Sequence, residues 1–333
     1  MTKSRIIRFA VMLPKDKARK IRIPERIESL CQQEGIEVTT IDAFKLKEDK
    51  IEANFDIVLH KIFDYFNEPE LTVEQMQDVI QNCKDFFEQN PKMIVLDDTE
   101  KYRKCTDRLY CTRIMRECSL FVDGIQVFVP KSLEIAAGLP SDQVRDMLSE
   151  AKINFPILVK PMYTSDRKMS LVFSLDDVNE KCSPSLVQEF YNHNDVMYKV
   201  FVMNNRYNVI QRPSIKNYEK DPHQKPIFLD SRDVSKMGRG FHPEIHKSDP
   251  SKQTWQSSFS NPDILNKSVL NSLCVKLRDA SGLKMFGFDL LVVRETGHYA
   301  IVDLNPFPGF KGIPDDVFAD DFVQMLKDLV FSK

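Results

Sequence analysis

The sequence predicts an α/β fold in which helices flank a parallel sheet in the N-terminal third of the chain. Segments typical of strands and of helices alternate from residue 6 to residue 96, as in a parallel sheet covered by helices. Near the C-terminus, two apolar runs with alternating and β-branched residues predict an antiparallel hairpin. With 333 residues, the chain is long enough for two or three domains with a sizeable core.

The N-terminal part is expected to alternate short strands with amphipathic helices. Strands are expected at residues 6–13, 36–41, 55–62 and 93–96. A helix is expected at residues 24–34, where Ile27, Leu30 and Cys31 would share one face, and a longer helix at residues 73–89.

The pattern changes after Lys101, which predicts a different architecture for the rest of the chain. Helices are expected around Asp107-Arg108, before Lys152 and at residues 268–281. Strands are expected at residues 127–129, 155–161 and 186–191, and in a hairpin that turns at Asn204-Asn205. The polar residues 217–256 are expected to form a long connection that is functional or mobile. We expect three domains, at residues 1–112, 113–200 and 201–333.

The C-terminal hairpin carries the most informative polar residues. If the hairpin is centred on Thr296, Asp289 lies directly opposite Asp303, and Asn305 lies opposite Gly287 on the same face. Two facing carboxylates repel each other, so such a pair favours a cation between or beside them. Oxygen ligands of this kind suit Mg²⁺. The alternative is a solvated hairpin whose acids bind nothing, but its apolar flanks indicate a central place in the sheet.

Two segments in the middle of the chain favour a nucleotide site. Lys160 ends the apolar run 157–159, and a lysine at the end of a buried strand needs an anion, such as a nucleotide phosphate. The alternative is a lysine whose side chain simply extends to solvent. Residues 186–191 leave a strand and enter a linker, where backbone groups can pair with an adenine; the alternative is an ordinary strand end.

Basic residues gather where strands are expected to end, which is the edge at which open α/β sheets bind ligands. They follow the first strand, close the third and flank the later hairpin: Lys15, Lys17, Arg19, Lys20, His60, Lys61, Lys199, Arg212 and Lys216. Each charge alone is more often a solvated surface group. Their joint placement favours a polyphosphate ligand, and nearby hydroxyls can bond phosphate or ribose oxygens: Ser214, Ser231 and Ser235.

Composition excludes several classes of protein. The net charge of −2 argues against general nucleic-acid binding, and no apolar run is long enough to span a membrane. Seven scattered cysteines without CxxC spacing are expected to be reduced thiols in a cytoplasmic protein. The chain has no GxxxxGK[ST], GxGxxG or GxSxG motif. We expect a monomer that acts on a small soluble molecule, with neither nucleic acid nor membrane as partner.

Three stretches together resemble the ATP-grasp arrangement and, within it, the inositol 1,3,4-trisphosphate 5/6-kinase (inositol tetrakisphosphate 1-kinase) family. They are FDIVLHK from Phe55, NHNDVMYKVFVMNNRYNVIQRPSIKN from Asn192, and FGFDLLVV from Phe286 through VDLNPFPGF. The resemblance covers nearly the whole chain. It implies an ATP-grasp fold of three domains, with ATP between the central and C-terminal domains. It also implies Mg²⁺-dependent transfer of the ATP γ-phosphate to a hydroxyl of a soluble inositol tris- or tetrakisphosphate.

The resemblance further implies a role for each matching residue. Lys17, Lys61 and Lys199 resemble the lysines that hold inositol phosphates, and Asn305 with Gly309 would lie beside the substrate. Nucleotide contacts are implied for Arg108, Lys160, Gln188, Glu189, Phe190, Tyr191, Ser214, Ser231 and Ser235, of which residues 188–191 resemble the adenine hinge. Magnesium ligands are implied at Asp289, Asp303 and Asn305.

One departure from the family pattern concerns the loop after Lys160. The family has a glycine-containing loop with two histidines there, whereas this chain continues PMYTSDRKMSLVF, without glycine or histidine. We expect Arg167 or Lys168 to take over the charge role, and Arg167 and Lys199 to be catalytic; a guanidinium stabilises phosphoryl charge but cannot act as a general base. Two alternatives stay open: a weak or inactive inositol-phosphate- and ATP-binding protein of the same fold, and an ATP-grasp carboxylate–amine ligase, which the basic residues disfavour.

Overall fold

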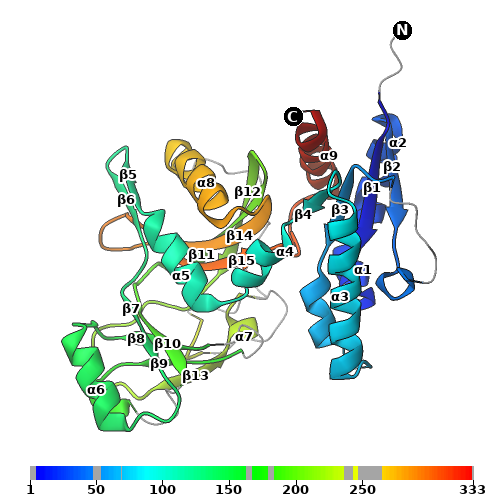
Figure 1. Ribbon diagram of the computed structural model, residues 1–333. Coiled ribbons are helices and arrows are strands. Elements are labelled where there is room, and N and C mark those ends of the chain that lie inside the picture. The colour runs from blue at the N-terminus through cyan, green and yellow to red at the C-terminus, as the bar shows by residue number, and fades with distance from the viewer. Residues whose placement is uncertain are drawn as a thin grey trace.

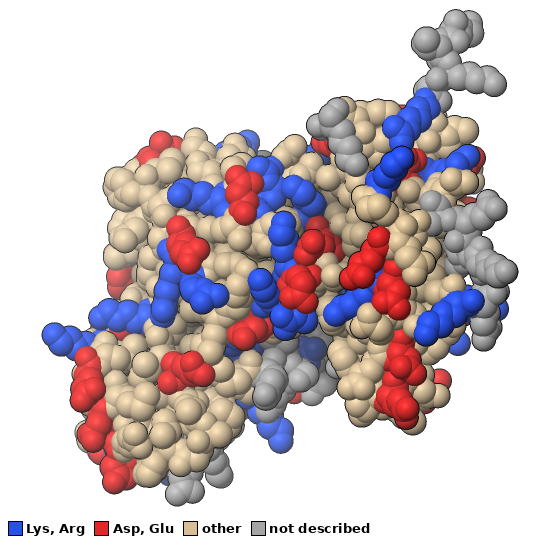
Figure 2. All heavy atoms as spheres, viewed as in Figure 1, with Lys and Arg blue, Asp and Glu red and all other residues tan. Residues whose placement is uncertain are grey.

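Three sheets carry the fold of the computed structural model, which describes residues 5–47, 54–68, 70–162, 167–178, 184–235, 243–246 and 265–331 (Figure 1). The six cysteines within these ranges are free, as the sequence predicted, and all six are buried; Cys182 lies outside these ranges. Within the same ranges, no helix has the length and apolar character needed to cross a membrane. On the face shown in Figure 2, basic and acidic side chains are interspersed.

The N-terminal domain contains a parallel sheet, as predicted, and its strands lie in the order β2-β1-β3-β4. Its strands are β1 (Ile7–Met12), β2 (Ile36–Thr40), β3 (Ile57–His60) and β4 (Ile94–Leu96). Its helices are α1 (Lys15–Ile21), α2 (Ile23–Gln33) and α3 (Val73–Gln89), with 3₁₀ turns η1 (Ala43–Lys45) and η2 (Ile62–Asn67). A capping box between Thr72 and Gln75 starts α3 where the sequence predicts it. The helix α1 and the turn η2 were not predicted.

The C-terminal helix α9 (Asp315–Phe331) packs against the N-terminal sheet, so both ends of the chain share one core (Figure 1). Phe322 of α9 meets Phe9 of β1 edge to face, with ring centroids 5.7 Å apart. The opposite face of this sheet is covered by α3. This packing holds the N-terminal domain against the last part of the chain.

The middle sheet is antiparallel where its strands pair, in the order β13-β9-β8-β10-β7, and helix α6 (Ser141–Glu150) covers it. Its strands are β7 (Ser132–Ile135), β8 (Ile157–Pro161), β9 (Lys168–Val172), β10 (Ser185–Glu189) and β13 (Ile227–Asp230), and a 3₁₀ turn η3 lies at Leu175–Asp177. The prediction of an uninterrupted connection over residues 217–256 was wrong, because it contains β13 and the short helix α7 (Ser231–Ser235). β13 is an edge strand of only four residues, too short for its alternation of buried Ile227 and Leu229 with exposed Phe228 to stand out in a polar segment.

The third sheet has the order β12-β11-β14-β15-β6-β5 and contains the acidic hairpin. Its strands are β5 (Leu120–Val122), β6 (Ile125–Phe128), β11 (Val196–Met203), β12 (Arg206–Pro213), β14 (Met285–Val292) and β15 (Tyr299–Pro306). Helices α5 (Arg108–Glu117) and α8 (Lys267–Ser281) pack on it, and α4 (Thr99–Lys104) joins it to the first domain. Strands cross the expected boundaries: β5 and β6 join this sheet, and β13 joins the middle one. The three-part division remains a prediction.

Candidate active site

The acidic hairpin has the predicted register at its polar residues. Asp289 of β14 pairs with Asp303 of β15, and Gly287 pairs with Asn305. On the other side of β14, Lys199 of β11 is the cross-strand partner of Asp289, and its ammonium donates to both carboxylate oxygens, at 2.8 and 2.7 Å. Asn305 Nδ2 donates to Asp303 Oδ2 at 3.0 Å. Lys199, Asp289 and Asp303 therefore lie side by side in one row across β11, β14 and β15.

A β-bulge lies beside the acid pair, which the sequence did not predict. The register shifts between Asp289 and Leu290: Leu290 pairs with Ile301, so Val302 is an extra residue on β15. The carbonyl of Val302 accepts a hydrogen bond from Lys160 Nζ at 3.0 Å. The bulge thus joins the middle sheet to the acidic hairpin.

The electrostatics of the acid pair favour a cation. Burial raises the pKa of Asp289, and the charge of Asp303 raises it further, while Lys199 and Lys160 act in the opposite direction. Among the described residues, no group of three His, Cys, Asp or Glu side chains could hold a metal. The predicted set therefore depends on the carboxamide of Asn305 as its third oxygen ligand. Two facing carboxylates and a carboxamide on a rigid sheet fit a hard divalent cation.

Two cations from other elements lie next to this row. Lys160, near the end of β8, is buried and donates to Gln188 Oε1 at 2.6 Å; burial, together with the nearby charge of Arg108, lowers its pKa to about 8. Arg108 begins α5 and donates from Nη1 to the carbonyl of Pro161 at 3.0 Å. Within the described residues, the buried Nε of Arg108 has no hydrogen-bond partner. A buried N–H without an acceptor is costly, and a phosphate oxygen would satisfy it.

The predicted adenine hinge follows β10, with its side chains engaged inside the protein. Glu189 Oε1 accepts from the backbone and side-chain nitrogens of Asn154, at 2.9 and 2.8 Å. Its Oε2 accepts from the Tyr191 hydroxyl at 2.9 Å, and the Phe190 N–H donates to Pro156 at 2.9 Å. These contacts fix the course of the linker and engage the Gln188 and Glu189 side chains within the protein.

The predicted serines differ in their surroundings. Ser214 is buried, and its Oγ lies 2.7 Å from His193 Nε2, while His193 Nδ1 lies 2.7 Å from the Tyr191 carbonyl. Because a carbonyl can only accept, Nδ1 carries the proton, and the neutral ring accepts from Ser214. The Ser231 N–H donates to the Arg167 carbonyl at 2.9 Å, and the Arg167 side chain is exposed. The side chain of Ser235 lies outside what the structure describes.

The N-terminal lysines reach the site through the segment that follows Asn305. Lys61, directly after β3, is buried, and its Nζ donates to the carbonyl of Phe307 at 2.8 Å. Asp64 Oδ2 lies 3.1 Å from Lys61 Nζ and 3.5 Å from Lys17 Nζ. Gly309 is exposed, and a Cβ built on it would meet nothing within 4 Å. The N-terminal domain thus presents Lys61 to the loop beside the acid pair, and Lys17 shares the Asp64 carboxylate with Lys61.

The structure therefore brings together Lys160, Arg108, Lys199, Asp289, Asp303 and Asn305, with Lys17 and Lys61 on the side of the N-terminal domain. Sequence reasoning gave no role to His193, Val302 or Asp97. Asp97 was recognised only as the end of a strand. Short-range signals could not show that Val302 and Asp97 contact segments more than a hundred positions away, at Lys160 and Lys284 respectively.

Comparison with known proteins identifies the family of the chain. Residues 123–328 match the inositol 1,3,4-trisphosphate 5/6-kinase ATP-grasp domain, and residues 9–101 match the pre-ATP-grasp domain of that family. Similar proteins include the inositol-tetrakisphosphate 1-kinase of Danio rerio, 27% identical over 97% of this chain and 79% of that protein. The enzyme of the same name from Xenopus laevis is 27% identical over 92% of this chain and 76% of that protein.

Solved structures of similar fold include the ATP-grasp ligase PsnB complexed with a minimal precursor, with a TM-score of 0.58, 15% identity and coverage of 96% of this chain and 100% of that chain. The D-cycloserine synthetase DcsG gives a TM-score of 0.57 with 13% identity, over 97% of this chain and 99% of that chain.

The fold and its paired acids define an ATP-grasp protein. The chain belongs to the inositol 1,3,4-trisphosphate 5/6-kinase family, a family of ATP-dependent inositol phosphate kinases, as its resemblance predicted.

Proposed function

We propose that the protein is a Mg²⁺-dependent kinase that transfers the γ-phosphate of ATP to a hydroxyl of a soluble inositol tris- or tetrakisphosphate. The facing pair Asp289 and Asp303, with Lys199 and Lys160 beside it, supports this proposal most directly. The names of the relatives, inositol-tetrakisphosphate 1-kinase, agree with it.

The nucleotide side of the site uses residues of the middle and third sheets. Lys160 and the orphaned Arg108 Nε would hold ATP phosphates, and the backbone of residues 188–191 would hold the adenine. Ser214 and Ser231 would contribute oxygens near the nucleotide, with Ser214 acting as an acceptor because its proton is given to His193. ATP would then lie between the two sheets, as the fold implies.

The metal side of the site consists of Asp289, Asp303 and Asn305. Magnesium held there would neutralise charge on the phosphates during transfer. Lys199, which already pairs with Asp289, can turn toward an acceptor phosphate once a divalent cation offsets the two acids. This exchange of partners lets one lysine serve both the apo and the loaded site.

The acceptor side is formed by Lys17, Lys61 and Lys199, with Asn305 and Gly309 beside the substrate. An inositol hydroxyl oxygen would bond to the γ-phosphorus while the bond from that phosphorus to ADP breaks, and the hydroxyl proton would leave to solvent. No covalent enzyme intermediate is needed. Because such transfer depends mainly on positioning and charge neutralisation, Arg167 can contribute charge without acting as a base.

The test is ADP production by purified protein with ATP, Mg²⁺ and inositol 1,3,4-trisphosphate or inositol 3,4,5,6-tetrakisphosphate. Asp303→Asn should reduce turnover by at least about 100-fold, since one metal ligand loses its charge. Asp142→Asn, at an exposed site on α6, is the matched control and should behave as wild type. Undiminished turnover in Asp303→Asn would refute the metal assignment.

A second function is favoured by one observation, the loop after Lys160 without glycine or histidine. Such a loop fits a protein that binds ATP and inositol phosphate with little or no transfer. Calorimetric binding of both ligands by wild type, with no ADP formed during long incubation, would establish this function instead. Phosphate release that requires both an amine and a carboxylate would indicate a ligase.

A further inference from the structure

The segment after β4 connects the N-terminal sheet directly to the strand that carries Asp289. Asp97 follows β4 and is buried, and its carboxylate accepts from the backbone N–H groups of Lys284, at 2.7 Å, and Met285, at 2.9 Å. Met285 is the first residue of β14, four positions before Asp289. One side chain therefore fixes the beginning of the acid-bearing strand.

The main chain of Asp97 is held from the other side by His60. His60 Nε2 lies 2.6 Å from the Asp97 carbonyl, and the Ile62 N–H lies 3.4 Å from His60 Nδ1. Because a carbonyl only accepts, Nε2 carries the proton and Nδ1 is the acceptor. Burial lowers the pKa of His60 to about 4, which keeps this neutral form near pH 7. The next residue is Lys61.

Lys61 connects the N-terminal domain to the segment that follows the acidic hairpin. Its Nζ donates to the carbonyl of Phe307 at 2.8 Å, and the Phe307 N–H donates to the carbonyl of Met285 at 2.9 Å. Phe307 comes two residues after Asn305. The contacts thus run from Lys61 through Phe307 and Met285 to Asp97, and back through His60. We call this closed set of five residues the interdomain ring.

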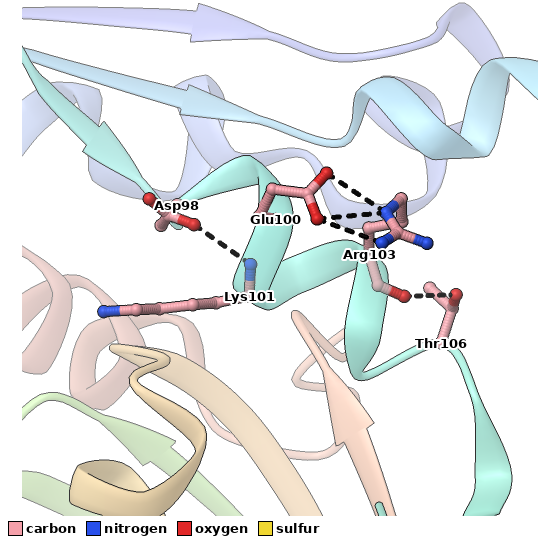
Figure 3. Close-up of polar contacts among 5 residues, drawn as sticks. All are labelled: Asp98, Glu100, Lys101, Arg103 and Thr106. Atoms are coloured by element: carbon pink, nitrogen blue, oxygen red, sulfur yellow. Dashed lines mark hydrogen bonds and ion pairs between the residues drawn. The ribbon is translucent and has the colours of Figure 1, made fainter. Parts of the chain in front are cut away.

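Helix α4 adds a second attachment beside the ring. The Asp98 carboxylate accepts from the Lys101 N–H at 3.0 Å and starts the helix, while the Lys101 side chain extends away from the Glu100–Arg103 pair (Figure 3). A Cβ built on Gly282 would lie 2.5 Å from Lys101 Cδ, so this side chain lies against the C-terminal end of α8. A cation at that end of a helix is favourable.

We propose that Asp97 is a positioning residue that fixes Lys61 at a set distance from the acidic hairpin and so tunes binding of the inositol phosphate. The proposal rests on the acceptor role of Lys61 in the proposed function. Burial raises the pKa of Asp97 to about 7, which means that the ionised carboxylate is destabilised at this position between two domains. The two carboxylate oxygens of Asp97 accept from two successive backbone N–H groups, and an asparagine, which has a single side-chain oxygen, cannot form both bonds in the same way.

The test is a double-mutant cycle on Asp97→Asn and Lys61→Ala, with KM measured separately for inositol 1,3,4-trisphosphate and for ATP. Asp97→Asn should raise the KM for the inositol phosphate about tenfold and change the KM for ATP less than about twofold. In the Lys61→Ala background, Asp97→Asn should add little, because its effect passes through Lys61. Asp98→Asn, which keeps an oxygen for capping α4, is the matched control and should match wild type.

Fully independent effects of the two substitutions would overturn the proposal, as would an unchanged KM with only kcat reduced, which is the sign of partial unfolding. If Asp97→Asn does not fold, His60→Gln tests the ring from its other side with the same readouts. Calorimetric dissociation constants for the inositol phosphate give a readout without turnover. If wild type binds the inositol phosphate but forms no ADP, the kinase function is refuted, and the role of the interdomain ring can still be tested by binding. If wild type does not bind the inositol phosphate, both the kinase function and the role of Asp97 are refuted.

Discussion

Lys199 and Asp289 form an ion pair across β11 and β14 in which one ammonium donates to both oxygens of one carboxylate, at 2.8 and 2.7 Å. Asp303 faces the same carboxylate from the opposite strand. The row therefore carries two negative charges and one positive charge before any ligand binds. This balance explains how the sheet tolerates facing acids, and it leaves room for additional positive charge.

Removing the lysine should make the fold depend on a divalent cation. In EDTA, Lys199→Met should lose on the order of 1–3 kcal/mol of stability, less than a fully buried pair would, because the Lys199 side chain is 24% exposed. Added Mg²⁺ should raise the melting temperature more in this variant than in wild type, since it replaces the missing charge. Lys20→Met, which removes an exposed ion pair with Asp16, is the control. Equal Mg²⁺ shifts in both proteins would contradict the prediction.

Alanine substitutions at Gly309 and Gly312 should have different effects, the first on binding of the inositol phosphate and the second on the stability of the fold. At Gly309 a Cβ meets nothing within 4 Å, so Gly309→Ala should leave the melting temperature unchanged but raise the KM for the inositol phosphate, if that ligand lies over this residue. Gly312 has φ +103°, and a Cβ there would lie 2.7 Å from Arg212 Nη2. Gly312→Ala should therefore cost at least about 1–2 kcal/mol in urea unfolding. A destabilised Gly309→Ala with unchanged KM would reverse this assignment.

His60 and Asp97 should give opposite pH dependences of stability. For Asp97, the pKa in the folded state is raised to about 7, so the folded state keeps a proton between about pH 4 and 7 that the unfolded state has lost. Its contribution to stability therefore falls as pH rises through this window. For His60, with a folded pKa of about 4, stability falls as pH decreases from about 6.5 to 4.

The expected outcome is measured by urea unfolding of variants against wild type. The loss of stability caused by Asp97→Asn should shrink as pH rises from about 5 to 8, and that caused by His60→Gln should shrink as pH falls from about 7 to 4.5. Differences of up to a few kcal/mol are expected, because each unit of pKa shift corresponds to about 1.4 kcal/mol. A loss that is independent of pH in either variant would show that its group does not titrate in this way.

Lys160 should matter for ATP rather than for the acceptor. Lys160→Met keeps the length of the side chain but removes its donation to Gln188 and Val302, and the positive charge beside Arg108. The KM for ATP should rise about tenfold or more, with a smaller change for the inositol phosphate. The exposed Lys45→Met is the control. A larger effect on the acceptor than on ATP would argue against the assignment of Lys160.

The sequence pattern was sufficient to predict those helices and strands whose apolar residues recur with a helical or strand period. The helix at residues 73–89 was predicted to the residue because its apolar face and its Thr72 cap agree. The pairing of Asp289 with Asp303 was predicted from a hairpin centred on Thr296; the tip has a register offset by one residue, and the bulge at Val302 restores the predicted pair. By contrast, β13 was missed because a run of four residues is too short to show a period within the polar segment around it.

Long-range contacts could not be read from the sequence. The spacing placed Lys61 at the end of a strand, but its contact with Phe307 depends on how α9 and the interdomain ring hold two domains together. Similarly, nothing local indicates that Ser214 is paired with His193, which changes it from a donor into an acceptor. These contacts arise from packing between sheets, which a single-sequence pattern does not encode.

The bulge at Val302 determines which residue of β15 faces Asp289. At the tip of the hairpin the register pairs Leu290 with Ile301; continued without interruption, it would put Val302 opposite Asp289 and Leu304 opposite Gly287. The acid and the amide of β15 reach their places because the bulge takes Val302 out of the pairing. A hairpin that kept the register of its tip throughout would contain the same side chains and yet place an apolar residue opposite Asp289.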